Sequence, residues 1–167
     1  MTLKKVIHRK SAPNTESKCK EICDEESMNY IKSLQIQCRK NRATKDPLVK
    51  SNEQWDMPRV VCSCGKPGSN IISIDSCRAT IKASNCHPKL TKVLPGPLNS
   101  KFPLKGMGIS GRGFRVGHCA EPHAANTLLR MTNCNVSHIV FGTAFRTEDC
   151  TFRDYCLTCK ATFKQLK

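Results

Sequence analysis

Aromatic residues are scarce in this sequence, and long apolar runs are absent. One Trp, two Tyr and six Phe make up only 5% of the 167 residues. A helix that crosses a bilayer needs about 18 or more consecutive apolar residues, and the sequence contains no such stretch. The first ten residues also lack the apolar segment of a secretory signal peptide. The sequence therefore predicts neither a membrane span nor export by the general secretory route.

Acidic residues are also scarce. The chain has 13 Asp and Glu against 28 Lys and Arg, a net charge of +15, and 22 of the basic residues precede Cys119. An excess of positive charge attracts polyanions and releases the counterions of their phosphates. The charge favours nucleic acid as a partner, bound mainly by the part of the chain before Cys119. The alternative is that the high pI only keeps the protein soluble.

The length suits one domain with its own core. We expect a basic flexible arm over residues 1–15 and a single domain over 16–167. Within this domain, residues 16–58 form a helical segment and a connector, and residues 59–167 form the core. A near-helical spacing of apolar and small residues predicts a helix over 16–41, with a break placed near Ser27.

Four further elements are expected in the core. Two β-prone runs, 59–64 and 71–75, flank a turn-rich spacer and predict a hairpin. Helices are expected over 121–131 and 155–165, with a strand over 137–142 between them. The order helix, strand, helix predicts a right-handed crossover and an α/β sandwich.

Cysteine is abundant, with twelve residues. An even number of cysteines is compatible with disulfides, but the spacing of Cys119, Cys156 and Cys159 favours a metal site. Three thiolates would hold Zn²⁺ and leave its fourth position for water. The other nine are expected to be buried small side chains, although Cys62 and Cys64 with Cys77, Cys86 or His87 leave a second, structural zinc site open.

Glu121 follows Cys119 by two residues, where a carboxylate on the first helical turn can reach past the metal into a pocket. There it would transfer the protons of a zinc-bound water. The alternative is an ordinary acidic residue that stabilises the helix N-terminus. His118 is a second candidate for the first metal ligand, but it would change the spacing to the glutamate from two residues to three.

Candidate substrate-binding residues surround this motif. Arginines interleaved with phenylalanines can bind phosphates and stack on bases, although solvated arginines are nearly as common. His123 and Asn126 follow on the same predicted helix and could face a substrate. The full set of candidates is His118, His123, Asn126, Phe114, Arg115 and Arg146, with Arg112 and Phe145 beside them.

The two elements Cys119-Ala120-Glu121 and Cys156-Leu157-Thr158-Cys159 resemble the cytidine deaminase-like superfamily. The signature of that superfamily is His-x-Glu followed by Pro-Cys-x-x-Cys, with Cys able to replace the His. The longer string from Cys119 to Asn126 looks most like deaminase domains of bacterial polymorphic toxins. The resemblance covers about residues 112–165. It implies a three-layer α/β/α sandwich in which two helix starts carry the zinc ligands.

Three features depart from the family pattern. Tyr155 occupies the position before the Cys pair, where the family usually has Pro. The sequence ends eight residues after Cys159, so the strands that usually follow this helix are missing, unless upstream segments such as 59–75 take their places. A long stretch rich in Pro and Gly precedes the motif, which could form a substrate groove or a variable loop.

The resemblance implies a zinc-dependent hydrolase that deaminates a nucleobase. Together with the charge, it leads us to expect conversion of cytosine to uracil in single-stranded DNA or RNA. The alternatives are a deaminase of free cytidine or nucleotides, and a zinc-containing nucleic-acid-binding module without catalysis. We expect a protein that is cytoplasmic or delivered into a target cell. If it is a toxin domain, an inhibitory immunity protein would be its partner.

Overall fold

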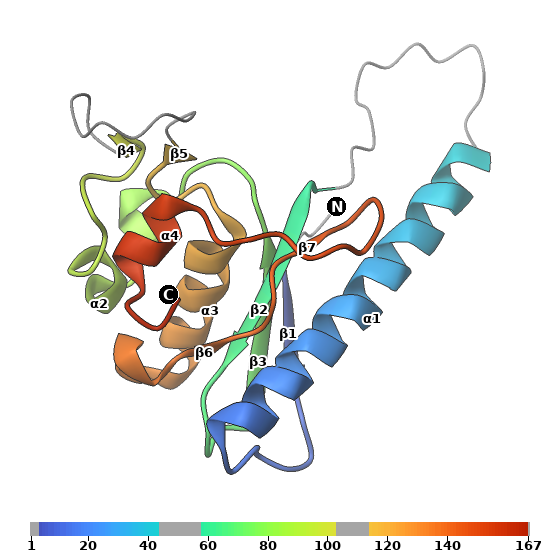
Figure 1. The fold of residues 1–167 in the computed structure, drawn as a ribbon, viewed down its shortest axis with the longest axis horizontal. Coiled ribbons are helices and arrows are strands. Elements are labelled where there is room, and N and C mark those ends of the chain that lie inside the picture. Colours follow the sequence, from blue (N-terminus) through green and yellow to red (C-terminus); the bar gives the residue numbers. More distant parts are fainter. Residues whose placement is uncertain (1–3, 44–57, 103–113, 167) are drawn as a thin grey trace.

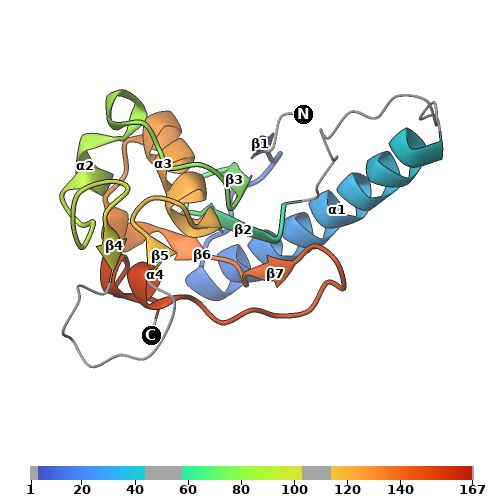
Figure 2. The same cartoon turned by 90° about the horizontal axis from the view of Figure 1, so that it is seen from above.

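A computed structural model describes residues 4–43, 58–102 and 114–166. Within these ranges the protein is a mixed α/β fold in which a small antiparallel sheet has helices on both faces (Figures 1 and 2). One long helix, α1 (Glu16–Ala43), covers one face of the sheet. The opposite face is covered by α3 (Ala120–Thr132), with α2 (Pro88–Thr91) and α4 (Leu157–Thr162) packed around it.

The hairpin of β2 (Val60–Gly65) and β3 (Ile71–Ser76) forms the centre of the sheet. The short strands β6 (Val140–Phe141) and β7 (Phe145–Arg146) both pair with β2 on its other side. Strands β3 and β6 are each antiparallel to β2, so they run in the same direction, and α3 connects them across one face. A separate two-stranded sheet joins β4 (Lys101–Phe102) to β5 (Phe114–Arg115).

The sheet edge next to β3 is formed by β1 (Lys5–His8), which pairs antiparallel with it from Lys5 opposite Ile74 to His8 opposite Ile71. A flexible arm was expected over residues 1–15, but residues 5–8 of that segment form β1. Val6 and Ile7 are half-buried. Their β-branched side chains favour an extended strand, and backbone pairing to β3 fixes the segment despite its basic flanks.

Successive side chains of β2 and β3 point to opposite faces of the sheet, so the two strands contribute to two separate cores. Val61, Ile72 and Ile74 face α1 and pack against Cys19, Cys23 and Ile31, all of which are almost fully buried. Cys62 and Cys64 of β2 point to the opposite face from Val61, toward α3, where they pack with Ala124, Leu128 and Phe163. Each helix therefore needs only one apolar stripe to cover its face of the sheet.

Most of the expected elements are present. The hairpin and the helices over 121–131 and 155–165 are confirmed, the last as the shorter α4. Helix α1 runs through Ser27 without a break, because Ser27 is itself buried on the packed face. The expected strand over 137–142 begins with a 3₁₀ turn, Val136–His138, and only Val140–Phe141 pairs. Another 3₁₀ turn, Ala83–Asn85, precedes α2.

The last regular element of the described residues is α4, so the sheet gains no strand after it. The hairpin over 59–75 is the centre of the sheet, and β1 extends the edge next to β3. No helix among the described residues has the length and apolar character needed to cross a membrane.

Candidate metal centre

Cys119 is the N-cap residue of α3, with an extended backbone at φ −70° and ψ 160°. The turn before it requires Gly117, whose φ of +83° is strained for any residue with a side chain. After Cys119, Pro122 is tolerated in the first turn because its missing N–H has no partner there anyway. The local sequence therefore fixes both the start of α3 and the direction of the Cys119 thiol.

Cys156 has the equivalent position at α4, as its N-cap residue with φ −71° and ψ 161°. Cys159 lies in the first turn of the same helix and is fully buried. The segment before Cys156 is held by Tyr155, whose hydroxyl donates a hydrogen bond of 2.8 Å to the carbonyl of Gly142. The backbone N–H of Tyr155 donates to Asp154 Oδ1 at 2.8 Å. Tyr155 thus holds the turn before Cys156 through both its side chain and its backbone.

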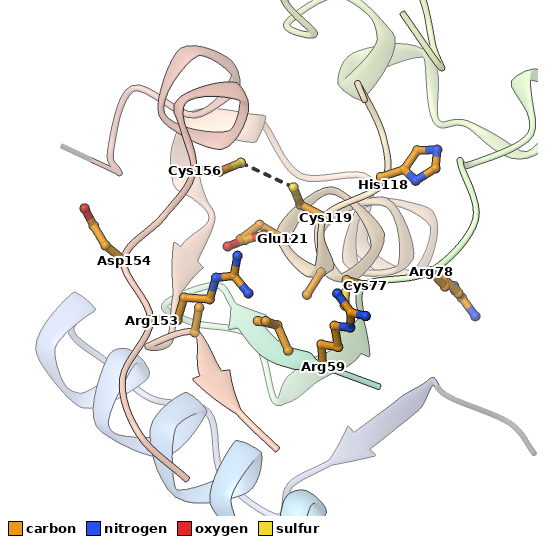
Figure 3. A pocket seen from close by; sticks show the side chains of 12 residues that line it. Arg59, Cys77, Arg78, His118, Cys119, Glu121, Arg153, Asp154 and Cys156 are labelled. Carbon is orange, nitrogen blue, oxygen red and sulfur yellow. Dashed lines mark hydrogen bonds between the residues drawn. The ribbon is translucent and has the colours of Figure 1, made fainter. Parts of the chain in front are cut away.

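The three thiols converge from these two helix starts. Their Sγ atoms all lie within 4.8 Å of one another, and those of Cys119 and Cys156 are 3.3 Å apart (Figure 3). Zn–S bonds of about 2.3 Å in tetrahedral geometry place sulfur atoms about 3.8 Å apart. The separations in the cluster are therefore close to those of thiolates that share one metal ion. It offers three ligands, and no fourth Cys, His, Asp or Glu belongs to it among the described residues.

Electrostatics favour a thiolate at Cys156. Hydrogen bonds from the Cys119 and Cys159 thiols, together with the N–H groups of Cys159 and Thr158, lower the pKa of Cys156 far below its usual range. A hydrogen bond with Cys156 raises the pKa of the Cys119 thiol. Hydrogen bonds with Cys119 and Cys156 raise the pKa of the Cys159 thiol. The N-termini of α3 and α4 add partial positive charge. Such a preformed anionic cluster is a suitable cation site.

Glu121 lies beside the three thiols but does not belong to the cluster of candidate metal ligands. Its side chain is only 4% exposed, and its Oε2 accepts a hydrogen bond of 3.3 Å from Cys159 Sγ. Burial raises the pKa of the Glu121 carboxyl to about 7, and the negative charge of Cys156 adds to this shift. A carboxyl group with a pKa near neutrality can both accept and donate a proton at physiological pH.

A cavity of about 350 Å³ opens in front of the cysteines and Glu121. Arg59, Arg78 and Arg153 line it, against the two acidic residues Glu121 and Asp154. Figure 3 shows the Arg153 side chain directed toward Glu121, and its positive charge opposes the rise in the pKa of that carboxyl. Among the described residues, neither Arg59 nor Arg153 has a salt-bridge partner. The pocket thus combines thiols that could hold a metal ion, a buried carboxyl group and two arginines without a salt-bridge partner among the described residues.

The structure separates the predicted substrate residues into groups. His118 lines the metal pocket, where burial lowers its pKa, and its ring faces Asn99 Oδ1 at 3.4 Å. His123 and Asn126 line a neighbouring cavity instead. Arg115 donates to Asn99 and Arg146 belongs to β7, and neither lines the metal pocket. Phe145 packs against the α1 core. Phe114 belongs to β5, and Arg112 lies outside the described residues.

Arg59, Arg78 and Arg153 were missed by the sequence reasoning. Their positions carry a usable signal, since Arg59 and Arg78 flank the predicted hairpin and Arg153 lies three residues before Cys156. Residues at strand ends and before a ligand helix are the ones that can reach a pocket at the helix start. The arginines predicted from the sequence were Arg112, Arg115 and Arg146 instead.

All twelve cysteines are free, which removes the disulfide alternative. Cys62 and Cys64 are fully buried, and burial raises the pKa of both thiols, as expected of small apolar side chains. The second zinc site considered for Cys62 and Cys64 is not formed. Among the residues that the structure describes, only Cys119, Cys156 and Cys159 cluster closely enough to hold a metal.

Comparison of the chain with protein-family profiles, curated proteins and solved structures gave no match.

Proposed function

We propose that this protein is a zinc-dependent deaminase that acts on a base within nucleic acid, with cytosine preferred over adenine. One observation carries the proposal. Three cysteines from two helix starts meet at one point, and a nearly buried glutamate from the first turn of α3 lies next to them in a pocket. A structural zinc site has four protein ligands and needs no such carboxylate.

The arrangement of elements supports the same proposal. A long helix, a hairpin, the Cys119 helix, a short strand and the Cys156 helix follow one another, with helices on both faces of the sheet. This order agrees with the α/β/α sandwich that the resemblance to cytidine deaminase-like proteins implies. The sheet is shorter than that resemblance suggests, because no strand follows α4 among the described residues.

In this scheme Cys119, Cys156 and Cys159 hold the zinc. The ion would supply a hydroxide nucleophile at neutral pH, since coordination lowers the pKa of water from about 16 toward about 7. Glu121 takes the proton released in that ionisation on its carboxylate. It passes that proton to the ring nitrogen of the base as the hydroxide adds to the ring carbon. It then takes the proton of the added hydroxyl group and delivers it to the amine, which leaves as ammonia. Its burial and its pKa of about 7 suit both transfers.

The preference for a polymer comes from charge. The chain carries +15, and three arginines line the pocket around the cysteines. A base must leave its stack to enter a pocket of this kind, and single strands allow this at a low cost in free energy. The cationic pocket also favours a substrate with a phosphate over a neutral nucleoside.

The test compares purified, zinc-loaded wild type with two variants of matched charge change. Glu121→Gln removes the proton carrier, and Asp154→Asn removes the other acidic residue of the same pocket, which is exposed. Incubation with single-stranded DNA and RNA, followed by sequencing, reports the converted base. We expect conversion by wild type and Asp154→Asn. Glu121→Gln should keep its zinc and lose at least about 10²-fold in rate, the size of a lost proton-transfer catalyst.

Two results would replace this proposal. Conversion of free cytidine or CMP without conversion of polymers would make the protein a nucleoside or nucleotide deaminase. Zinc and nucleic-acid binding without ammonia release, unchanged in Glu121→Gln, would make it a binding module.

A further inference from the structure

A second cavity, also of about 350 Å³, adjoins the metal pocket, and Arg78 lines both. Three other cations reach it from separate parts of the fold. Lys4 precedes β1, Lys82 precedes the 3₁₀ turn Ala83–Asn85, and Arg130 lies in the last turn of α3. All three are exposed, and no Asp or Glu is among the described residues that line this cavity. A concave surface with only positive charge favours a polyanion.

Arg78 is fixed at the junction of the two cavities by two buried side chains. Its Nη2 donates to Asp75 Oδ2 at 2.8 Å, and its Nε donates to His123 Nδ1 at 3.3 Å. Asp75 is fully buried and His123 is 5% exposed. Because an arginine Nε–H can only donate, His123 Nδ1 must accept, and its Nε2–H then donates to Ala79 O at 3.1 Å.

This support leaves the remaining N–H groups of Arg78 for a ligand. Arginine has five N–H donors in a fixed planar fork, of which Asp75 and His123 each take one. A fork held at the correct angle loses little side-chain entropy when it binds a phosphate. In contrast, Asn126 in the same cavity is engaged in the fold, since its side chain accepts from His87 N and donates to Asn85 O.

We propose that the second cavity binds the backbone of a single-stranded polynucleotide next to the nucleotide whose base enters the metal pocket. Arg78 binds the phosphate that joins the two nucleotides, and Lys4, Lys82 and Arg130 bind the phosphates beyond it. This rests on the proposed function and makes it more specific, because a free nucleoside or mononucleotide would leave these cations unused.

A third basic cavity supplies a matched control. It measures about 580 Å³, is lined by Lys89, Lys92 and Lys164, and shares no residue with the metal pocket. Lys89 is engaged at the end of α3, where its ammonium donates to the carbonyls of Asn133 and Cys134. Replacing Lys92 and Lys164 therefore removes the same charge from the protein as replacing Lys82 and Arg130, but at a site away from the proposed path.

The experiment measures binding in the zinc-loaded Glu121→Gln background, so that ligands stay unreacted. The probes are a fluorescent single-stranded oligodeoxynucleotide containing one cytosine, its RNA equivalent, and CMP as competitor. With Lys82→Ala/Arg130→Ala we expect at least about tenfold weaker oligonucleotide binding and a salt dependence reduced by about 1.4 in slope, the value for two lost phosphate contacts on a single strand. CMP binding should not change. Lys92→Ala/Lys164→Ala should leave both nearly unchanged.

Equal weakening in the two double variants, or none in either, would overturn the inference. So would a loss of CMP binding that matches the loss of oligonucleotide binding. The proposed function can fail on its own. If wild type converts no base but Lys82→Ala/Arg130→Ala still weakens oligonucleotide binding, only the catalytic proposal is contradicted. If Lys82→Ala/Arg130→Ala converts bases as fast as wild type at a low concentration of oligonucleotide, only the proposed role of the second cavity is contradicted.

Discussion

The hydroxyl of Tyr155 donates a hydrogen bond of 2.8 Å to the carbonyl oxygen of Gly142. Gly142 in turn donates its N–H to Ser63 O of β2 at 2.9 Å. The residue before Cys156 is therefore tied to the central strand of the sheet. This connection matters because the helix that carries Cys156 and Cys159 is only six residues long. So short a helix has little stability of its own and depends on tertiary contacts.

Tyr155→Phe should therefore weaken the metal centre without removing a ligand. It takes away the hydrogen bond to Gly142, and we expect a loss of about 1 kcal/mol in stability together with weaker zinc binding. Tyr155→Pro should cost more because it also removes the N–H that donates to Asp154 Oδ1. Urea denaturation and competition with a chromogenic chelator measure the two effects. Wild-type zinc affinity in both variants would contradict this account.

Removal of the metal should destabilise the protein. Without a cation, the negative charge at Cys156 faces two other sulfur atoms and Glu121 in a half-buried site. Chelation should therefore lower the unfolding temperature, and Cys156→Ser should show the same lower temperature with or without chelator. Cys77→Ser is the control, since Cys77 lines the same pocket but is outside the cluster. It should keep one zinc per chain, measured by atomic emission.

Local pattern was sufficient to predict much of the fold. The hairpin over residues 59–75 was visible because β-branched residues flank a turn containing Gly68, whose φ is +78°. The strand at Lys5–His8 was not, because Val6 and Ile7 are only two apolar residues among cations, and their pairing with β3 is a contact distant in sequence. The strand over 137–142 was overestimated because Ser137 and His138 turn before the chain reaches the sheet.

The cluster of Cys119, Cys156 and Cys159 was predicted because the spacing of cysteines at helix starts is a local property of the sequence. The rest of the pocket was not predicted, because Arg59, Arg78 and Arg153 reach it from three separate segments. Their convergence depends on how the sheet places its strand ends beside α3. Their positions near strand ends and before Cys156 mark these arginines as candidates, but only the tertiary fold brings them to one pocket. His123 is similar: it was weighed as a substrate residue, but its ring nitrogens contact Arg78 and Ala79 O.

Gly142 should tolerate no side chain. A Cβ atom there would lie 2.7 Å from Ser63 Oγ, 2.8 Å from Cys23 Cβ and 2.9 Å from Asp24 Oδ1. Gly142→Ala should therefore destabilise the protein by about 1–3 kcal/mol, as overpacking does, and shift the anchor of Tyr155. Gly68→Ala is a useful comparison, since it has a positive φ but no atom within 4 Å. It should cost only about 1 kcal/mol from backbone strain. Thermal unfolding compares the two, and an equal cost would argue against close packing at Gly142.

Asp75 and His123, the two buried residues that hold Arg78, have pKa values displaced in opposite directions. Burial raises the pKa of Asp75 from 3.8 to about 6, although the Ser76 N–H and Arg78 oppose the shift. Burial and the charge of Arg78 lower the pKa of His123 from 6.5 to about 4. A raised carboxyl pKa gives stability that is present below pH 3.8 and lost as the pH rises to about 6. A lowered imidazole pKa gives stability that is present above pH 6.5 and lost as the pH falls to about 4.

The two contributions are each about 3 kcal/mol and cover nearly the same pH range, so they should largely cancel in the wild type. Removing either one should expose the other. Relative to wild type, Asp75→Asn should gain stability from pH 3.8 to about 6, because it lacks the contribution that Asp75 loses over that range. Relative to wild type, His123→Gln should lose stability from about pH 4 to 6.5, because it lacks the contribution that His123 gains over that range. Urea denaturation at half-unit pH steps gives both slopes. Slopes of the same sign in the two variants would show that Asp75 and His123 are not both buried beside Arg78 as described.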